Sequence, residues 1–263
     1  MSDTYQRVVH DGITFRCRID SPGGSHPWVV FSNSLVTDLT IWDAQVQALA
    51  GRYNILRYDQ RGHGGTSVPA GPCDFDQLGG DLLALLDHFA IARCTLVGLS
   101  MGVPTCLWVL GRRPQAVERL VLCDGQVRTA AAGAETWQER IDAARTLGMA
   151  KVAEQTAERW FSPAFRASGG SARAEAVIAG MALEGYIACA CALQAYDLSD
   201  VVPEIAVPVL LMAGANDGNM PGSMQQLADT IPGASFQLVP GAGHIPNCEQ
   251  PETFNRNLLA FLD

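Results

Sequence analysis

Short apolar segments alternate with longer amphipathic segments along most of the chain. The short segments are apolar on both faces, which is typical of strands in a buried parallel sheet. They cover residues 28–31, 53–58, 95–97, 119–122, 208–212 and 235–239. Ahead of them, residues 5–19 alternate in polarity around Asp11-Gly12, a pair that favours the turn of a β-hairpin.

The segments between these strands carry apolar residues at helical spacing. In residues 75–89, for example, Leu78, Leu82, Leu85 and Phe89 fall on one helix face. Further helices are expected at 41–50, from Ser100 to about residue 111, at 224–230 and at 252–262. Strands that alternate with helices predict βαβ units and a mostly parallel, twisted sheet flanked by helices.

The alternation stops between about residues 128 and 200, where the chain is rich in alanine and helical in pattern. Helices are expected there at 137–147, 150–161 and 172–196, with Gly169-Gly170 as a break. A helical block inserted between two strands of one sheet predicts a lid. We therefore expect a core formed by residues 1–127 and 201–263 and a helical lid formed by residues 128–200.

The composition is that of a folded globular protein. Hydrophobic residues make up 48% and charged residues 17% of the 263 positions, and the net charge is -9. Because Lys and Arg are not clustered, we expect no nucleic-acid partner, and an anionic small-molecule substrate has to meet a local cation. We also expect no membrane association, since no segment has the roughly 18 apolar residues of a membrane span and the first residues lack the apolar run of a signal peptide.

The eight cysteines form no spaced metal-binding or redox motif. No pair has C-x-x-C spacing, and several, such as Cys94 and Cys123, lie in apolar segments where small buried thiols are common. We expect reduced thiols, no metal and a cytoplasmic location. A homo-oligomer is compatible with the sequence, which does not specify the oligomeric state.

Gly98-Leu99-Ser100-Met101-Gly102 is the strongest chemical signal in the chain. It follows an expected strand and precedes an expected helix, which is the context of a nucleophile elbow. Small residues on both sides allow the tight turn, and the serine hydroxyl then stands at a helix N-terminus, where partial positive charge gathers. Ser100 is the predicted nucleophile, although ordinary Gly-Ser turns share the pattern.

A serine nucleophile needs a base, and the base needs an acid that orients it. After such an elbow the chain order is serine, acid, histidine, and His244 is the histidine that follows Ser100. Asp217, a few residues after the strand at 208–212, is the favoured acid. Asp124, at the end of an earlier strand, is the rival carboxylate.

The tetrahedral intermediate of acyl transfer needs N–H donors that are already in place. One is expected from Met101, directly after the nucleophile, and the other from Leu35 in the loop at residues 32–38. The turn at residues 59–64 also contains a histidine, His63. We expect a structural role for it, in a turn whose Asp59 and Arg61 brace the active-site face.

Taken together, these segments resemble the 3-oxoadipate enol-lactonases, α/β-hydrolases of the β-ketoadipate pathway of aromatic breakdown. The matching segments are SNSLVTDLTIWDAQ (32–45), LRYDQRGHG (56–64), GLSMG (98–102), ERWFSPAF (158–165), LEGYIACACAL (183–193) and HIPNCEQPETF (244–254). YDxRGHG and GxSMG occur widely among α/β-hydrolases, whereas the SNSL, RWF and EGY segments are more selective. The resemblance spans nearly the whole chain.

The resemblance implies an α/β-hydrolase fold with a triad of Ser100, Asp217 and His244 and backbone donors at Leu35 and Met101. It also implies that no cofactor is needed. The implied reaction is the hydrolysis of a small anionic enol-lactone to 3-oxoadipate.

Two positions depart from the family pattern, because Val36 and Val103 stand where the family usually has glycine. Both changes add bulk near the nucleophile or the oxyanion loop, so the substrate is open. The alternatives are a carboxylesterase or another lactonase on the same triad, a C–C bond hydrolase acting on a ring-cleavage product, and a catalytically silent small-molecule receptor.

A substrate carboxylate needs a cation or several hydrogen-bond donors in its pocket. The candidates in the expected lid are Arg140, Lys151 and Arg159. Arg140 is favoured because it shares a helix face with Trp137 at i, i+3, so both are predicted substrate-binding residues. A solvated or lid-bracing arginine is the alternative.

Overall fold

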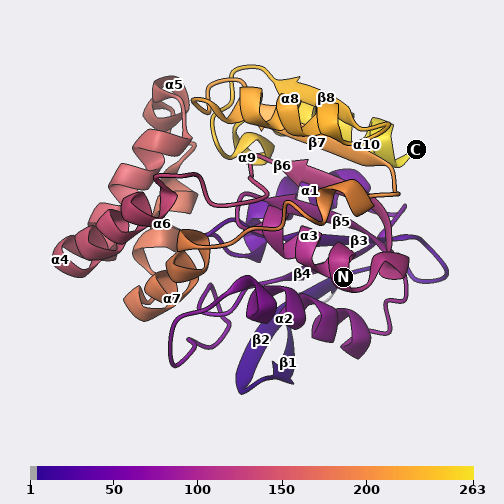
Figure 1. Cartoon of the computed structure of the whole chain (residues 1–263), viewed down its shortest axis with the longest axis horizontal. Coiled ribbons are helices and arrows are strands. Elements are labelled where there is room, and N and C mark those ends of the chain that lie inside the picture. The colour runs from indigo at the N-terminus through magenta and orange to yellow at the C-terminus, as the bar shows by residue number, and fades with distance from the viewer. Residues whose placement is uncertain (1–4) are drawn as a thin grey trace.

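A twisted sheet of eight strands forms the centre of the computed structural model, which describes residues 5–263 (Figure 1). In spatial order the strands are β1 (Gln6–His10), β2 (Ile13–Asp20), β4 (Asn54–Tyr58), β3 (Trp28–Ser32), β5 (Cys94–Leu99), β6 (Val117–Cys123), β7 (Val209–Gly214) and β8 (Ser235–Val239). The strands from β4 to β8 are parallel, and β1 and β2 form the antiparallel hairpin. Residues 1–4 lie outside the described residues. They belong to the expected core and to the N-terminal segment that we expect not to be a signal peptide.

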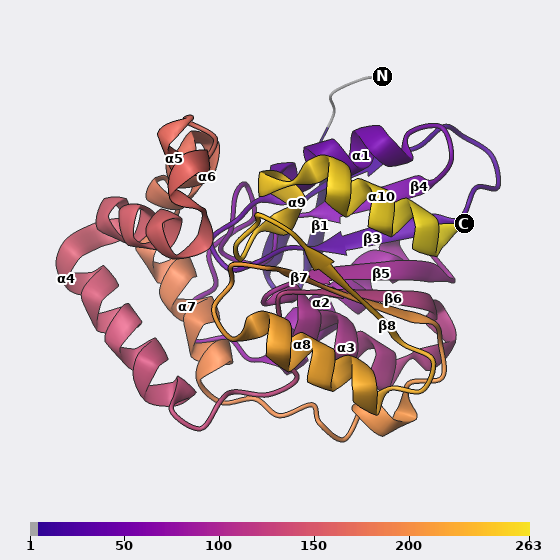
Figure 2. The same ribbon diagram turned by 90° about the horizontal axis from the view of Figure 1, so that it is seen from above.

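Helices cover both faces of the sheet (Figure 2). The strands carry apolar side chains on both faces, and the helices bury them in two apolar cores. The 3-10 helix η1 (Leu39–Trp42), α1 (Asp43–Leu49) and α10 (Pro251–Leu262) pack on one face, and α2 (Phe75–His88), α3 (Gly102–Arg112) and α8 (Met220–Thr230) pack on the other. Successive strand residues alternate between the two apolar cores: Val29 and Phe31 belong to the first, and Val30 to the second.

Four helices inserted between β6 and β7 form a further layer beside the sheet (Figures 1 and 2). They are α4 (Gly133–Trp160), α5 (Pro163–Ala167), α6 (Ala172–Ala179) and α7 (Leu183–Gln194). We call residues 128–200 the helical insertion. The chain enters and leaves it through a narrow neck, where the Thr129 amide donates to the Tyr196 carbonyl and the Leu198 amide to the Val127 carbonyl, both at 2.9 Å.

The inserted helices agree with the prediction in α4 and differ from it in one other place. The helices expected at 137–147 and 150–161 are both present within α4, as two helical segments that meet at a kink at Gly148, where φ is 78°. The single helix expected at 172–196 was wrong: it is two helices, α6 and α7, bent by 100°, because Gly180 caps α6 and Ala182 is extended. No single helix within residues 5–263 is long and apolar enough to cross a membrane, although the bent pair α6 and α7 meets the length and composition criteria together.

Direct backbone contact between Gly62 and Gly185 docks the helical insertion on the core. A Cβ atom on Gly185 would lie 2.4 Å from the Gly62 carbonyl oxygen, which is far closer than van der Waals contact. Nearby, the Cys189 thiol donates to the Arg61 carbonyl at 3.3 Å. Helix α7 therefore lies directly against the turn at residues 59–64, and no side chain larger than hydrogen fits between them.

We expect Gly185→Ala to lower the melting temperature by several degrees, because overpacking against backbone costs about 1–3 kcal/mol. The matched control is Gly80→Ala in α2, where an added Cβ meets nothing within 4 Å. Since alanine is the better helix former, this control should be neutral or stabilising. Thermal unfolding followed by circular dichroism measures both, and equal melting temperatures for the two variants would contradict the close contact.

Candidate active site

The turn after β5 holds Ser100 in a strained backbone conformation. Its φ of 54° lies in the left-handed region, and its amide donates to the Cys123 carbonyl at 2.8 Å. A Cβ on Gly98 would lie 2.4 Å from the Gly102 carbonyl oxygen, and a Cβ on Gly102 would lie 2.2 Å from the Ser32 carbonyl oxygen. Both glycines are therefore required by close backbone packing, and they leave the serine side chain at the start of α3.

Three side chains from distant parts of the chain meet at the carboxyl ends of the parallel strands. His244 Nε2 lies 2.9 Å from Ser100 Oγ, and His244 Nδ1 lies 2.7 Å from Asp217 Oδ2. When Nδ1–H donates to the carboxylate, Nε2 presents its lone pair to the hydroxyl and is placed to accept the proton. The structure thus brings together the three side chains that the sequence predicts as nucleophile, base and acid.

The loop that carries His244 is tied to the helical insertion. The His244 amide donates to the Trp160 carbonyl at 2.9 Å, and the two rings lie 5.5 Å apart. Glu249 accepts from the Gly243 amide and the Ser162 amide, both at 2.9 Å. Sequence reasoning missed Trp160 and Glu249. Their only signal was that they lie in the family-like segments ERWFSPAF and HIPNCEQPETF.

Asp124, the rival carboxylate, lies close to the other two titratable groups. Carboxyl oxygens of Asp124 and Asp217 and a ring nitrogen of His244 lie within 4.8 Å of one another. Within residues 5–263 this is the single cluster of His, Cys, Asp or Glu side chains close enough to hold a metal ion. Two of its three members are already joined by a direct hydrogen bond, and it is Asp217 that meets the imidazole.

The amides of Leu35 and Met101 have nothing to donate to within residues 5–263, which fits a role as oxyanion donors. Both residues line the same cavity as Ser100. Met101 is also the residue before α3, so its amide lies at a helix N-terminus. Amides that are fixed and unoccupied in this way are suited to hold a developing negative charge.

His63 holds the loop that carries Leu35. Its Nε2 accepts the Val36 amide at 3.0 Å and its Nδ1 donates to the Arg61 carbonyl at 3.0 Å. The bond at Nε2 requires the neutral imidazole, and burial lowers the pKa of His63 to about 4. Val36 has a φ of 60°, a conformation that favours glycine, and the bond to His63 helps to hold it there.

Two ion pairs brace the turn at residues 59–64. Arg61 pairs with Asp81 through two hydrogen bonds of 2.6 Å, and both side chains are buried. The Asp59 carboxylate pairs with Arg16 and accepts the Leu39 amide at 2.7 Å. The turn is therefore fixed from both sides beneath the oxyanion loop.

A cavity of about 420 Å³ is lined by the triad side chains and by residues of the helical insertion. Those on the insertion side include Trp137, Arg140, Arg159 and Tyr186. The Arg140 guanidinium lies over the Trp137 ring, 4.7 Å from its centroid. The third candidate cation, Lys151, is not in the wall of this cavity and pairs with Glu154 at 2.7 Å.

Arg140 and Arg159 form no ion pair with any acidic group of residues 5–263. Arg159 donates to the Thr156 hydroxyl at 3.1 Å, and burial together with the neighbouring Arg140 lowers its pKa. Tyr186 lies buried beside them, and burial raises its pKa. Two uncompensated cations in one cavity attract an anion, and the structure adds Arg159 to the favoured Arg140.

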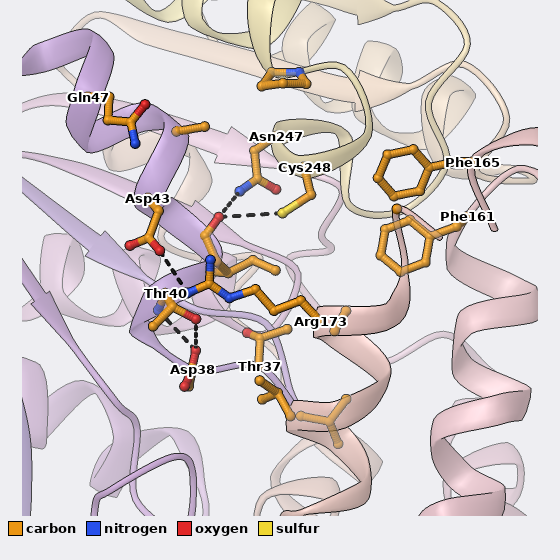
Figure 3. A pocket seen from close by; sticks show the side chains of 17 residues that line it. Thr37, Asp38, Thr40, Asp43, Gln47, Phe161, Phe165, Arg173, Asn247 and Cys248 are labelled. Atoms are coloured by element: carbon orange, nitrogen blue, oxygen red, sulfur yellow. Dashed lines mark hydrogen bonds and ion pairs between the residues drawn. The ribbon is translucent and has the colours of Figure 1, made fainter. Parts of the chain in front are cut away.

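A second cavity, of about 320 Å³, lies between η1 and α1 on one side and α5 and α6 on the other (Figure 3). It shares Val36 with the first cavity and contains none of the triad residues. Its cation, Arg173, pairs with Asp43 at 2.8 Å, as Figure 3 shows. This second cavity therefore lacks the triad, and its arginine is already paired.

Comparison with known proteins places this fold and site in a family. A family model of the alpha/beta hydrolase fold matches residues 27–251, so the chain belongs to the alpha/beta hydrolase family. It is 35% identical over 239 residues to 3-oxoadipate enol-lactonase 2 of Acinetobacter baylyi, and this match covers 90% of this chain and 88% of that protein. Among solved structures, the enol-lactonase from Burkholderia xenovorans LB400 superposes with a TM-score of 0.92 at 37% identity, covering 98% of this chain and 99% of the other. A hydrolase from Pseudomonas aeruginosa PA01 gives the same TM-score at 34% identity, with 100% and 99% coverage.

These similarities confirm the α/β-hydrolase fold, the resemblance to the 3-oxoadipate enol-lactonases and the expected class of enzyme, an ester or lactone hydrolase.

The neutral, buried His63 predicts an acid-dependent loss of stability. The pKa of His63 is lower in the folded protein than in the unfolded chain. Its contribution to the free energy of unfolding is therefore complete above the unfolded pKa of about 6.5, and it is lost as the pH falls towards the folded pKa of about 4. The loss is about 3 kcal/mol, since each pH unit in that window costs about 1.4 kcal/mol. Urea unfolding at several pH values should therefore show a shallower acid dependence for His63→Gln than for the wild type. His88→Gln, at an exposed histidine in α2, is the control that should keep the wild-type slope. Identical slopes for His63→Gln and wild type would contradict the prediction.

Proposed function

We propose that this protein hydrolyses a small anionic enol-lactone, 3-oxoadipate enol-lactone, to 3-oxoadipate through an acyl-enzyme on Ser100. The observation that carries the proposal is the hydrogen-bonded chain from Ser100 through His244 to Asp217 at a cavity whose wall holds two uncompensated arginines. The similarity to proteins named as enol-lactonases supports the choice of substrate.

In the first half of the reaction, His244 Nε2 takes the hydroxyl proton as Ser100 Oγ attacks the lactone carbonyl. The carbonyl oxygen becomes an oxyanion, which the Leu35 and Met101 amides stabilise. When the tetrahedral intermediate collapses, the ring C–O bond breaks and the enol oxygen leaves with the proton from the imidazolium. The enol then ketonises, and the acyl chain stays on Ser100.

The second half repeats these steps with water in place of the serine hydroxyl. His244 accepts a proton from the water, whose oxygen attacks the acyl carbonyl, and the same two amides hold the second oxyanion. The imidazolium then returns its proton to Ser100 Oγ as the ester bond breaks. Asp217 stays ionised throughout and stabilises the imidazolium, and the steps need no cofactor.

The arginine pair supports an anionic substrate over an uncharged ester. A neutral ester would leave the Arg140 and Arg159 guanidinium groups in the cavity wall with no negative partner. A carboxylate on the lactone accepts hydrogen bonds from one or both, and Trp137 beneath Arg140 offers a flat apolar surface to the ring. The hydrogen-bonded triad likewise favours an active hydrolase over a silent receptor.

Ser100→Ala is expected to lower kcat for the enol-lactone by about 10⁴-fold or more, because the covalent step loses its nucleophile. The melting temperature should stay close to the wild-type value. Lactone opening followed by absorbance measures the rate, and a fluorophosphonate probe should label the wild type and not the variant. Turnover that survives in Ser100→Ala would exclude the acyl-enzyme.

Arg140→Met and Arg159→Met should each raise KM for the anionic lactone by about 10- to 100-fold, since a charge-assisted hydrogen bond contributes about 1.5–3 kcal/mol. Hydrolysis of uncharged p-nitrophenyl acetate should change little, because the triad is intact. The matched control is Lys151→Met, which removes a cation of the helical insertion that lies outside the cavity. It should leave KM unchanged for the lactone and for p-nitrophenyl acetate. An equal loss on both substrates would assign the arginines to folding instead of recognition.

A further inference from the structure

Asp124 occupies a position that its packing alone does not explain. It follows β6, its side chain is fully buried, and its φ is 43°, in the left-handed region. One carboxyl oxygen, Oδ1, accepts the Gly214 amide at 2.9 Å. The other oxygen, Oδ2, is buried and has no hydrogen-bond partner among the described residues.

The Asp217 carboxylate lies close to the carboxyl group of Asp124. Atoms of Asp124, Asp217 and His244 lie within 4.8 Å of one another, so two ionised carboxylates would face each other in a site largely shielded from water. Like charges at this distance disfavour a second ionisation. Burial raises the pKa of Asp124 well above its ordinary value, and the neighbouring Asp217 charge raises it further.

We propose that Asp124 is a positioning residue that keeps its proton and donates it, from Oδ2, as a hydrogen bond to the Asp217 carboxylate. This inference rests on the proposed triad of Ser100, His244 and Asp217. It gives Oδ2 a partner, because a protonated carboxyl oxygen needs an acceptor and the Asp217 carboxylate supplies one. Asp124 is then held at both oxygens, by the Gly214 amide and by Asp217.

The proton on Asp124 serves the base in two ways. A donor behind Asp217 restrains that carboxylate so that its other oxygen faces His244 Nδ1. The neutral partner also limits the negative charge behind the imidazole to one unit. A second negative charge would favour the imidazolium form of the ring, which cannot act as a base.

The strained backbone makes asparagine the matched substitution at this position. Asparagine tolerates the left-handed region as aspartate does, its carbonyl oxygen can accept the Gly214 amide, and its NH₂ group can donate to Asp217. It differs from a protonated aspartate in little except that it cannot ionise. Besides Asp217 and His244, the neighbouring titratable group is the Cys123 thiol, whose pKa burial raises.

The test compares Asp124→Asn and Asp124→Gly in the full-length enzyme by the pH profile of kcat/KM. We expect Asp124→Asn to retain activity within about fivefold and to keep the acid limb, which reports His244, within about 0.3 pH units of the wild type. Asp124→Gly relieves the backbone but lacks the donor, so kcat should fall about 10- to 100-fold with KM little changed. Because glycine also removes side-chain volume, the loss of kcat at an unchanged KM and the pH profile are the readouts that separate a lost donor from lost packing.

Two results would overturn the proposal. A fall of the acid limb by one pH unit or more in Asp124→Asn would mean that an ionised carboxylate had been removed. A loss in Asp124→Asn as large as that in Asp217→Asn would make Asp124 the acid of the triad. If Ser100→Ala is inactive while either result holds, only this inference fails, whereas an active Ser100→Ala removes the proposed triad itself.

Infrared spectroscopy of the wild type supplies a measurement that does not depend on any variant folding. A protonated carboxylic acid at pH 7 has a C=O stretch separate from the carboxylate bands, and this stretch shifts on deuteration. We expect such a band in the wild type and its reduction in Asp124→Asn. A wild-type spectrum with no protonated carboxyl band at pH 7 would overturn the proposal.

Discussion

Direct contact between backbone segments at the carboxyl ends of the parallel strands determines where the reactive groups lie. Gly102 lies against the Ser32 carbonyl and Gly214 against the Gly243 carbonyl so closely that a Cβ atom on either glycine would overlap the oxygen. The first contact joins the turn after β5 to the end of β3, and the second joins the end of β7 to the loop after β8. The hydrogen bonds of Ser100, His244 and Asp217 follow from that packing, since short side chains reach one another only when their backbones are already close.

The same packing forces backbone strain into the site. Three of the five non-glycine residues with positive φ within residues 5–263, Val36, Ser100 and Asp124, line the triad cavity. Such conformations persist only when surrounding contacts hold them, and they concentrate where function needs a fixed geometry. Here His63 holds Val36 and the Cys123 carbonyl holds Ser100. The loop of Val36 and the turn of Ser100 are therefore held in fixed positions, which suits the proposed roles of oxyanion loop and nucleophile.

The cavity wall is locally positive, although the protein as a whole is negatively charged. The chain carries a net charge of -9, yet the wall that the helical insertion contributes to the cavity holds two arginines with no acidic partner among the described residues. On the opposite side, behind His244, two carboxyl groups lie together. The insertion also contacts the loop that carries His244: the Trp160 carbonyl accepts the His244 amide, and the Ser162 amide donates to Glu249. It therefore lines the cavity and, in addition, holds the loop of His244.

Local sequence determined the alternation of strands and helices, the hairpin at Asp11-Gly12, the turn around Ser100 and the chain order of the triad candidates, because periodicity and turn chemistry act over a few residues. Only the tertiary structure decided which carboxylate meets His244, that Arg159 joins Arg140 at the cavity, and that residues 172–196 form two helices. Trp160 and Glu249 were missed for the same reason. These outcomes depend on contacts between segments that are distant along the chain, such as the insertion and the loop after β8, and no short-range pattern encodes the distance between them.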